Sequence, residues 1–145
     1  MNYFQNKTLL VPLDFSEQAT KAVDVALELA DPSKTIHVVH VVEPTPAWLT
    51  VDPAVPIPPQ FDQQLYEWAV EKLKQMFAGG TYQRIQTHCL MGDPSAEILN
   101  LAKQLSVNLI IMPSHGRKGL NRLFLGSVAE RVLRGSHCPV LILRE

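Results

Sequence analysis

The sequence predicts an α/β domain in which five strands alternate with helices and form a mainly parallel sheet, with helices on both faces. Short apolar stretches of strand length alternate with segments whose apolar residues recur at helical spacing. Parallel strands need crossover connections, and the helical segments supply them. The 145 residues fit one compact domain, so we treat residues 1–145 as a single unit.

The first elements are a strand, a helix and a second strand. Residues 8–13 form a short apolar stretch bounded by a turn signal, which is typical of a buried strand. From about Ser16 the apolar residues follow helical spacing, until Asp31-Pro32-Ser33 ends the helix. Residues 35–42 are rich in β-branched side chains and predict the second strand.

A proline-rich segment interrupts the alternation. Residues 44–60 contain six prolines, a density that prevents both a helix and a central strand. We expect a long surface excursion, either a flap over a ligand or partner surface, or a tolerated insertion. Helical spacing returns over residues 62–78, and Gly79-Gly80 ends that helix.

The remaining elements complete the sheet. Residues 84–90 predict a more polar strand near an edge of the sheet. Residues 107–112 predict a strand that is apolar enough to be covered on both faces. Between them, Asp93 caps a helix whose first residue is Pro94, since proline has no N–H to leave unpaired there. The last helix and strand are expected at residues 127–134 and 139–143.

The loop after the fourth strand, residues 113–126, suggests a phosphate site. Gly126 and Ser127 stand where the last helix would begin, and a helix N-terminus offers unpaired N–H groups and a partial positive charge to an anion. Basic residues in the same loop add to this field: Arg117, Lys118 and Arg122. The alternative is that Gly126 ends a loop and Ser127 caps the helix with nothing bound.

The order of the strands in the sheet determines which strand end the loop 113–126 faces. Ligands of such sheets bind beyond the C-terminal strand ends, where the strand order reverses. If the order is 3-2-1-4-5, that point lies between strands one and four. The loop then faces the end of strand one, at Pro12, Leu13 and Asp14.

Composition narrows the class of partner. A net charge of −1 argues against nucleic acid and other large polyanions, although six of the thirteen Lys and Arg lie in residues 115–145. A local positive field suits a small phosphorylated ligand, and a solvated basic face is the alternative. We expect no membrane span and no signal peptide. Two isolated cysteines fit a reducing cytoplasm.

Other chemistry finds little support in the sequence. The five histidines and two cysteines lack zinc-site spacing, and neither a nucleophile elbow nor a P-loop occurs. Gly-x-Gly-x-x-Gly is also absent, which disfavours a dinucleotide dehydrogenase. We therefore expect no enzyme, with weak hydrolysis of a phosphorylated ligand left open.

With these residues in view, the chain resembles the universal stress protein family. The likeness begins at Leu10-Val-Pro-Leu-Asp-Phe-Ser16, continues through His40-Val-Val42, and ends with Gly126-Ser-Val-Ala-Glu-Arg-Val-Leu133 and Cys138-Pro-Val-Leu-Ile-Leu143. It implies a Rossmann-like, adenine-nucleotide α-hydrolase-like domain with strand order 3-2-1-4-5. It also implies a stress-response role, ATP with Mg²⁺ carried by the nucleotide, and a homodimer through Val140 to Leu143.

The resemblance also implies a set of contact residues. Nucleotide-binding members carry Gly-x2-Gly-x9-Gly-[Ser/Thr], which maps onto this chain with proline in place of the first glycine, and Leu13 stands where many relatives have a small hydroxyl residue. Asp14 would accept a hydrogen bond from ribose or adenine, or would instead cap the first helix. The implied contacts are Pro12, Leu13, Asp14, Val41, Pro113, Ser114, His115, Gly116, Gly126, Ser127 and Val128.

The two departures keep a second hypothesis open. Proline fixes φ and removes a donor where glycine would allow a positive φ or a close approach by phosphate. The alternative is a nucleotide-free interaction module of the same family that acts through dimerisation, for which the apolar edge at Val140 to Leu143 is suited.

Overall fold

The computed structural model describes residues 7–46, 54, 57–58, 60–116 and 124–144. Their five strands form one parallel sheet in the order β3-β2-β1-β4-β5, as predicted. The elements in chain order are β1 Leu9–Pro12, α1 Glu17–Leu29, β2 Ile36–Val42, α2 Phe61–Met76, a 3-10 turn η2 Gly80–Arg84, β3 Ile85–Met91, α3 Pro94–Gln104, β4 Leu109–Pro113, α4 Ser127–Gly135 and β5 Val140–Leu143.

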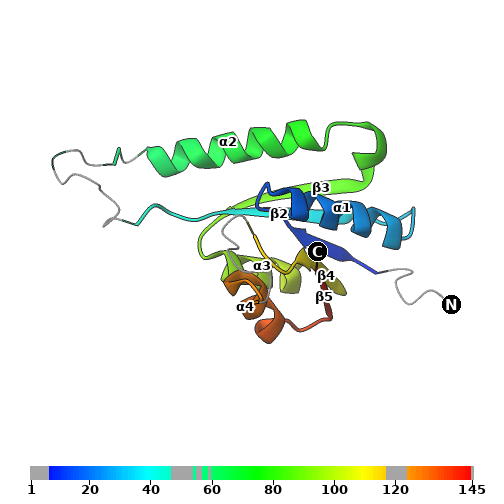
Figure 1. The fold of residues 1–145 in the computed structure, drawn as a ribbon. Coiled ribbons are helices and arrows are strands. Elements are labelled where there is room, and N and C mark those ends of the chain that lie inside the picture. The colour runs from blue at the N-terminus through cyan, green and yellow to red at the C-terminus, as the bar shows by residue number, and fades with distance from the viewer. Residues whose placement is uncertain (1–6, 47–53, 55–56, 59, 117–123, 145) are drawn as a thin grey trace.

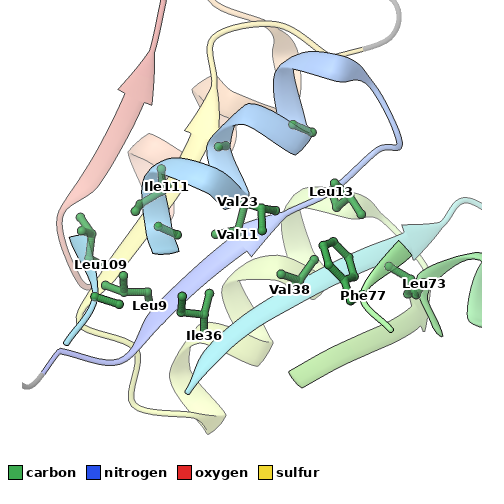
Figure 2. Packing of buried hydrophobic residues seen from close by; sticks show 14 residues of the cluster. Leu9, Val11, Leu13, Val23, Ile36, Val38, Leu73, Phe77, Leu109 and Ile111 are labelled. Carbon is green, nitrogen blue, oxygen red and sulfur yellow. The ribbon is translucent and has the colours of Figure 1, made fainter. Parts of the chain in front are cut away.

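Helices α1 and α2 cover one face of the sheet, and α3 and α4 cover the other (Figure 1). On one face, Leu9 and Val11 of β1 pack with the apolar sides of α1 and α2, as Figure 2 shows with Val23 and Leu73. On the other face, Leu10 of β1 packs with residues of α3 and α4. Because side chains alternate along a strand, the central β1 is buried on both faces.

Side-chain caps fix where two helices begin. Ser16 is the N-cap of α1, and its hydroxyl accepts a hydrogen bond from the Ala19 N–H at 3.2 Å. Asp93 caps α3 through the Ala96 N–H at 2.9 Å, with Pro94 at the first helical position, as predicted.

The connection after α2 is longer than predicted. The helix ends at Met76, and Gly79 and Gly80 both take positive φ angles, 72° and 59°. The chain then makes the 3-10 turn Gly80–Arg84 before β3, which lies at the sheet edge as expected. The Arg84 guanidinium holds this turn against the end of α1 through the carbonyl oxygens of Asp31 and Leu27, at 2.7 and 3.1 Å.

The proline-rich segment 44–60 lies only partly inside the described residues. Its first part is tied to α2, since the Thr45 N–H and hydroxyl both donate to the Asp62 carboxylate at 3.0 and 2.7 Å. These bonds hold the pKa of Asp62 below its usual value.

Among the described helices, none combines the length and apolarity that crossing a membrane requires.

Strands β1 and β4 separate toward their C-terminal ends. They pair only at Leu9 with Leu109 and at Leu10 with Ile110, although both strands continue. The Leu13 N–H donates to β2, at the Val39 carbonyl oxygen, so by alternation the nitrogen of Pro12 faces β4.

Strand β4 also turns a proline nitrogen toward the gap. The Ser114 N–H donates to β5, at the Leu143 carbonyl oxygen, so the nitrogen of Pro113 faces β1. Each strand thus turns a proline nitrogen, which has no hydrogen to donate, toward the gap between them.

Replacing Leu10 by alanine tests the central position of β1. Leu10 is fully buried, so Leu10→Ala leaves a cavity and lowers the free energy of unfolding by about 2–5 kcal/mol. The control is Leu133→Ala, because Leu133 is 48% exposed and its loss changes stability by roughly 0.5 kcal/mol or less. Urea unfolding of both variants gives the comparison, and equal losses would contradict this description of the core.

Candidate functional site

A cleft of about 530 Å³ opens at the C-terminal ends of the strands. It lies where β1 and β4 separate, which is the point where the strand order reverses. Ten of the eleven residues singled out in the sequence line it: Pro12, Leu13, Asp14, Val41, Pro113, Ser114, Gly116, Gly126, Ser127 and Val128. The fold therefore brings segments far apart in the sequence to one site.

His115 is the eleventh residue, and it is not part of the cleft lining. Its Nδ1 lies 3.0 Å from the hydroxyl of Ser114, while its Nε2 is buried without a hydrogen-bond partner among the described residues. Ser114 and Gly116, on either side of His115, do line the cleft.

Asp14 shapes the loop between β1 and α1. Its Oδ1 accepts hydrogen bonds from both the N–H and the hydroxyl of Ser16, at 3.0 and 2.5 Å. The alternative that Asp14 itself caps α1 is wrong, because Ser16 is the N-cap. Asp14 instead orients the residue that caps the helix, and its carboxylate lines the cleft.

Two glycines allow close approaches beside the cleft, one between the loops after β1 and β4 and one within the connection from β4 to α4. A Cβ at Gly116 would lie 2.6 Å from Oδ2 of Asp14, and a Cβ at Gly126 would lie 3.1 Å from the carbonyl oxygen of Ser114. That same carbonyl accepts the Gly126 N–H at 2.7 Å. A side chain at Gly116 would displace the Asp14 carboxylate, and one at Gly126 would crowd the Ser114 carbonyl oxygen.

The N-terminus of α4 faces this cleft. Gly126 is the N-cap, with φ −62° and ψ 153°, and Ser127 is the first helical residue. The alternative that Ser127 caps the helix is therefore wrong. Gly126 has no side chain to pair with the first N–H groups of α4, so the cleft has a partial positive charge at this end.

The two departures from the family pattern have different physical consequences. Leu13 is 3% exposed and its side chain packs in the core on the α1 face. Pro113 is the last residue of β4 and is buried in register with Leu143. The strand conformation suits proline, and the chain gives up one backbone N–H in the gap between β1 and β4.

The basic residues Arg117, Lys118 and Arg122 lie outside the described residues. Among the described residues near α4, Arg131 and Arg134 instead pair with Asp93 and Glu130 at 3.5 and 2.9 Å. Both pairs are exposed, so they contribute little to stability.

Sequence reasoning missed an aromatic group at the α2 side of the cleft. The rings of Phe15 and His40 pack at a tilt of 39° with their centroids 4.3 Å apart, and Phe15 meets Trp68 edge-on at 5.4 Å. All three residues line the cleft. The helical spacing of α2 could have placed Trp68 on the inner side, but the sequence gives no sign that Phe15 would reach it.

Phe15 also has an unusual backbone. Its φ is +63°, in the left-handed region that a bulky residue seldom occupies. The Nδ1–H of His40 donates to the carbonyl oxygen of Leu13 at 2.7 Å, which fixes the ring on which Phe15 rests. Contacts on several sides hold this strained position, a feature often associated with functional sites.

A pair of neighbouring histidines lies elsewhere on the sheet. Nδ1 of His37 and Nε2 of His88 are 3.0 Å apart, and burial lowers the pKa of both rings. Two ligands do not make a metal centre, and no cluster of three or more ligating side chains occurs in the described part of the chain.

The fold and the cleft define a class of protein: a parallel α/β domain with a ligand-sized cleft at the reversal of strand order and a helix N-terminus at one end. A family model described as the universal stress protein family matches residues 5–144. The chain belongs to this family.

Individual relatives agree with this assignment. The chain is 32% identical to universal stress protein MJ0531 of Methanocaldococcus jannaschii, with 96% of this chain and 82% of the relative covered. It is 33% identical to universal stress protein YxiE of Bacillus subtilis, with 94% and 97% covered.

Solved structures share the fold. The hypothetical protein MJ0577, whose structure was described as a structure-based assignment of biochemical function, superposes with a TM-score of 0.75 at 25% identity, covering 100% of this chain and 98% of that chain. A universal stress protein in complex with cAMP has a TM-score of 0.60 at 21% identity, with 95% and 96% covered.

A double-mutant cycle tests the contact between Gly116 and Asp14. Gly116→Ala lowers the free energy of unfolding by about 1–3 kcal/mol, because its Cβ displaces the Asp14 carboxylate. Asp14→Ala removes the atom that the Cβ meets, so the same glycine substitution costs less in that background. Urea unfolding of the four proteins measures the coupling, and strictly additive losses would refute the contact.

Proposed function

We propose that the cleft binds an adenine nucleotide, ATP with Mg²⁺ carried by the nucleotide, and that the chain is a cytoplasmic stress-response regulator without catalytic activity. In this proposal occupancy of the cleft is the signal, since a ligand that binds the folded state stabilises it and shifts loop populations. The phosphates lie at Gly116, Gly126, Ser127 and Val128, and the nucleoside lies at Asp14 and Val41.

The observation that carries this proposal is the convergence at the cleft. Ten residues from four separate segments, named from the phosphate-loop pattern and the family's adenine pocket, line the same 530 Å³ space. Gly116 and Gly126 make the narrow approaches that a larger residue would block. The unpaired N–H groups of α4 supply the donors that a phosphate requires.

The relatives add support at the level of the fold. One solved structure that shares this fold is a universal stress protein in complex with cAMP. A phosphorylated adenine nucleoside is thus a ligand that another protein with this fold binds. Cys89 and Cys138 are both free thiols, which suits a reducing compartment.

Two observations favour the second candidate, a nucleotide-free interaction module. The buried Leu13 side chain offers no hydroxyl to a ligand, and Pro113 offers no N–H. Binding must then rest on Asp14 and the start of α4, and a titration with ATP separates the two candidates.

Calorimetry of purified, nucleotide-stripped protein with Mg-ATP tests nucleotide binding. We expect saturable binding in the micromolar range, and Gly126→Val abolishes it because the new side chain meets the Ser114 carbonyl oxygen. The control is Ala78→Val, which adds a similar volume at an exposed position after α2. Absence of heat up to millimolar ATP would favour the nucleotide-free module, and unchanged affinity in Gly126→Val would refute the site.

We also propose a homodimer in which β5 pairs with β5 of a second copy. Strand β5 is a sheet edge whose four residues, Val140 to Leu143, are apolar and half-buried. Carbonyl oxygens of Pro139 and Leu143 accept from β4, so by alternation Ile142 directs its N–H away from the sheet.

Ile142→Pro tests this interface. It removes the outward donor and leaves the bonds to β4 in place, so sedimentation at micromolar concentration should shift from dimer to monomer. Ile142→Val keeps the N–H and serves as the control that stays dimeric. A monomeric wild-type protein, or a dimeric proline variant with native circular dichroism, would contradict pairing through β5.

A further inference from the structure

The α2 side of the cleft carries a feature that the proposed phosphate and nucleoside contacts do not use. Trp68 lines the cleft and is 50% exposed, although its neighbour Ala69 is fully buried. A large aromatic side chain that is half exposed at the wall of a cleft has apolar surface available to a ligand.

The wall is held by contacts from three elements. Phe15, from the loop after β1, packs against His40 of β2 on one side and against Trp68 of α2 on another. The ammonium of Lys72, one turn after Trp68, lies 4.5 Å from the Phe15 ring centroid and 4.6 Å from that of Trp68. These contacts fix both rings before any ligand arrives.

A chain of contacts places this wall relative to the phosphate end. The start of α4 meets the loop after β4 at Ser114, Gly116 of that loop meets the Asp14 carboxylate, and Phe15 follows Asp14 directly. A ligand whose phosphates lie at α4 and whose nucleoside lies at Asp14 and Val41 would have Phe15 and Trp68 in the wall of the same cleft, available to its base.

We propose that Phe15 and Trp68 form a base-contacting wall, and that Trp68 is a specificity-determining residue that selects ligands carrying a planar aromatic base. This inference rests on the proposed function and adds to it. Stacking on an aromatic side chain suits a purine, since every base has a π-face, and it distinguishes a nucleotide from a bare polyphosphate.

Binding of two probes, Mg-ATP and inorganic triphosphate, tests the wall. Trp68→Ala should weaken ATP binding about tenfold and leave triphosphate binding unchanged. Trp68→Phe keeps an aromatic ring and retains most of the affinity. The matched control is Phe61→Ala, because Phe61 is an aromatic residue of α2 that is 38% exposed and does not line the cleft.

Fluorescence provides a second measurement that does not depend on loss of binding. In Trp48→Phe, Trp68 is the sole tryptophan, so its emission reports on the wall directly. ATP should change this emission saturably over the same concentrations that calorimetry gives, whereas triphosphate should not.

The outcomes separate the two levels of the proposal. If wild-type protein binds ATP and Gly126→Val does not, the nucleotide site is supported. In that case, unchanged ATP affinity in Trp68→Ala together with Trp68 emission that ATP does not change would overturn only the wall. If wild-type protein binds no ATP, both fail together. Equal weakening of ATP and triphosphate in Trp68→Ala would also overturn the wall, because it would show a general effect on the cleft.

Discussion

The early separation of β1 from β4 is the constraint on which the site depends. The two strands pair over two residues, and beyond them Pro12 and Pro113 each turn a nitrogen without a hydrogen toward the gap. The hydrogen-bond ladder between β1 and β4 cannot continue there, because neither proline has an N–H to donate. The adjoining pairs β1–β2 and β4–β5 continue, so the sheet holds together on both sides while its centre opens.

The open centre brings the loops after β1 and β4 together at the end of the cleft that α4 faces. Asp14, after β1, and Gly116, after β4, come close to each other across the ends of these two strands. Gly126 then returns the chain against the Ser114 carbonyl and starts α4 over the gap. The burial of β1 on both faces anchors the strand from which Asp14 extends.

Sequence reasoning predicted all five strands and four helices because each has a strong local signal: an apolar stretch, a helical period, or a cap such as Asp93-Pro94. It named ten lining residues because the family pattern and the strand order point to one edge. It missed the 3-10 turn after Gly79, the capping role of Ser16, and Phe15 with Trp68. The turn and the aromatic contact depend on backbone angles and on contacts between distant segments, which no local pattern encodes. The Ser16 cap could have been found, because a serine just before a helical period is itself an N-cap signal.

Pro113 stands at the first glycine position of the phosphate-loop pattern, and the conformation of the remaining glycines shows what this replacement changes. Gly126 has a φ of −62°, which any residue adopts, and the glycine is needed there because the Ser114 carbonyl is close. The left-handed angle in this region belongs to Phe15 instead. Pro113, in strand conformation at the end of β4, therefore meets no conformational conflict. Its effect is the loss of one backbone donor, so in the proposed site the first turn of α4 must supply the N–H groups that a phosphate requires.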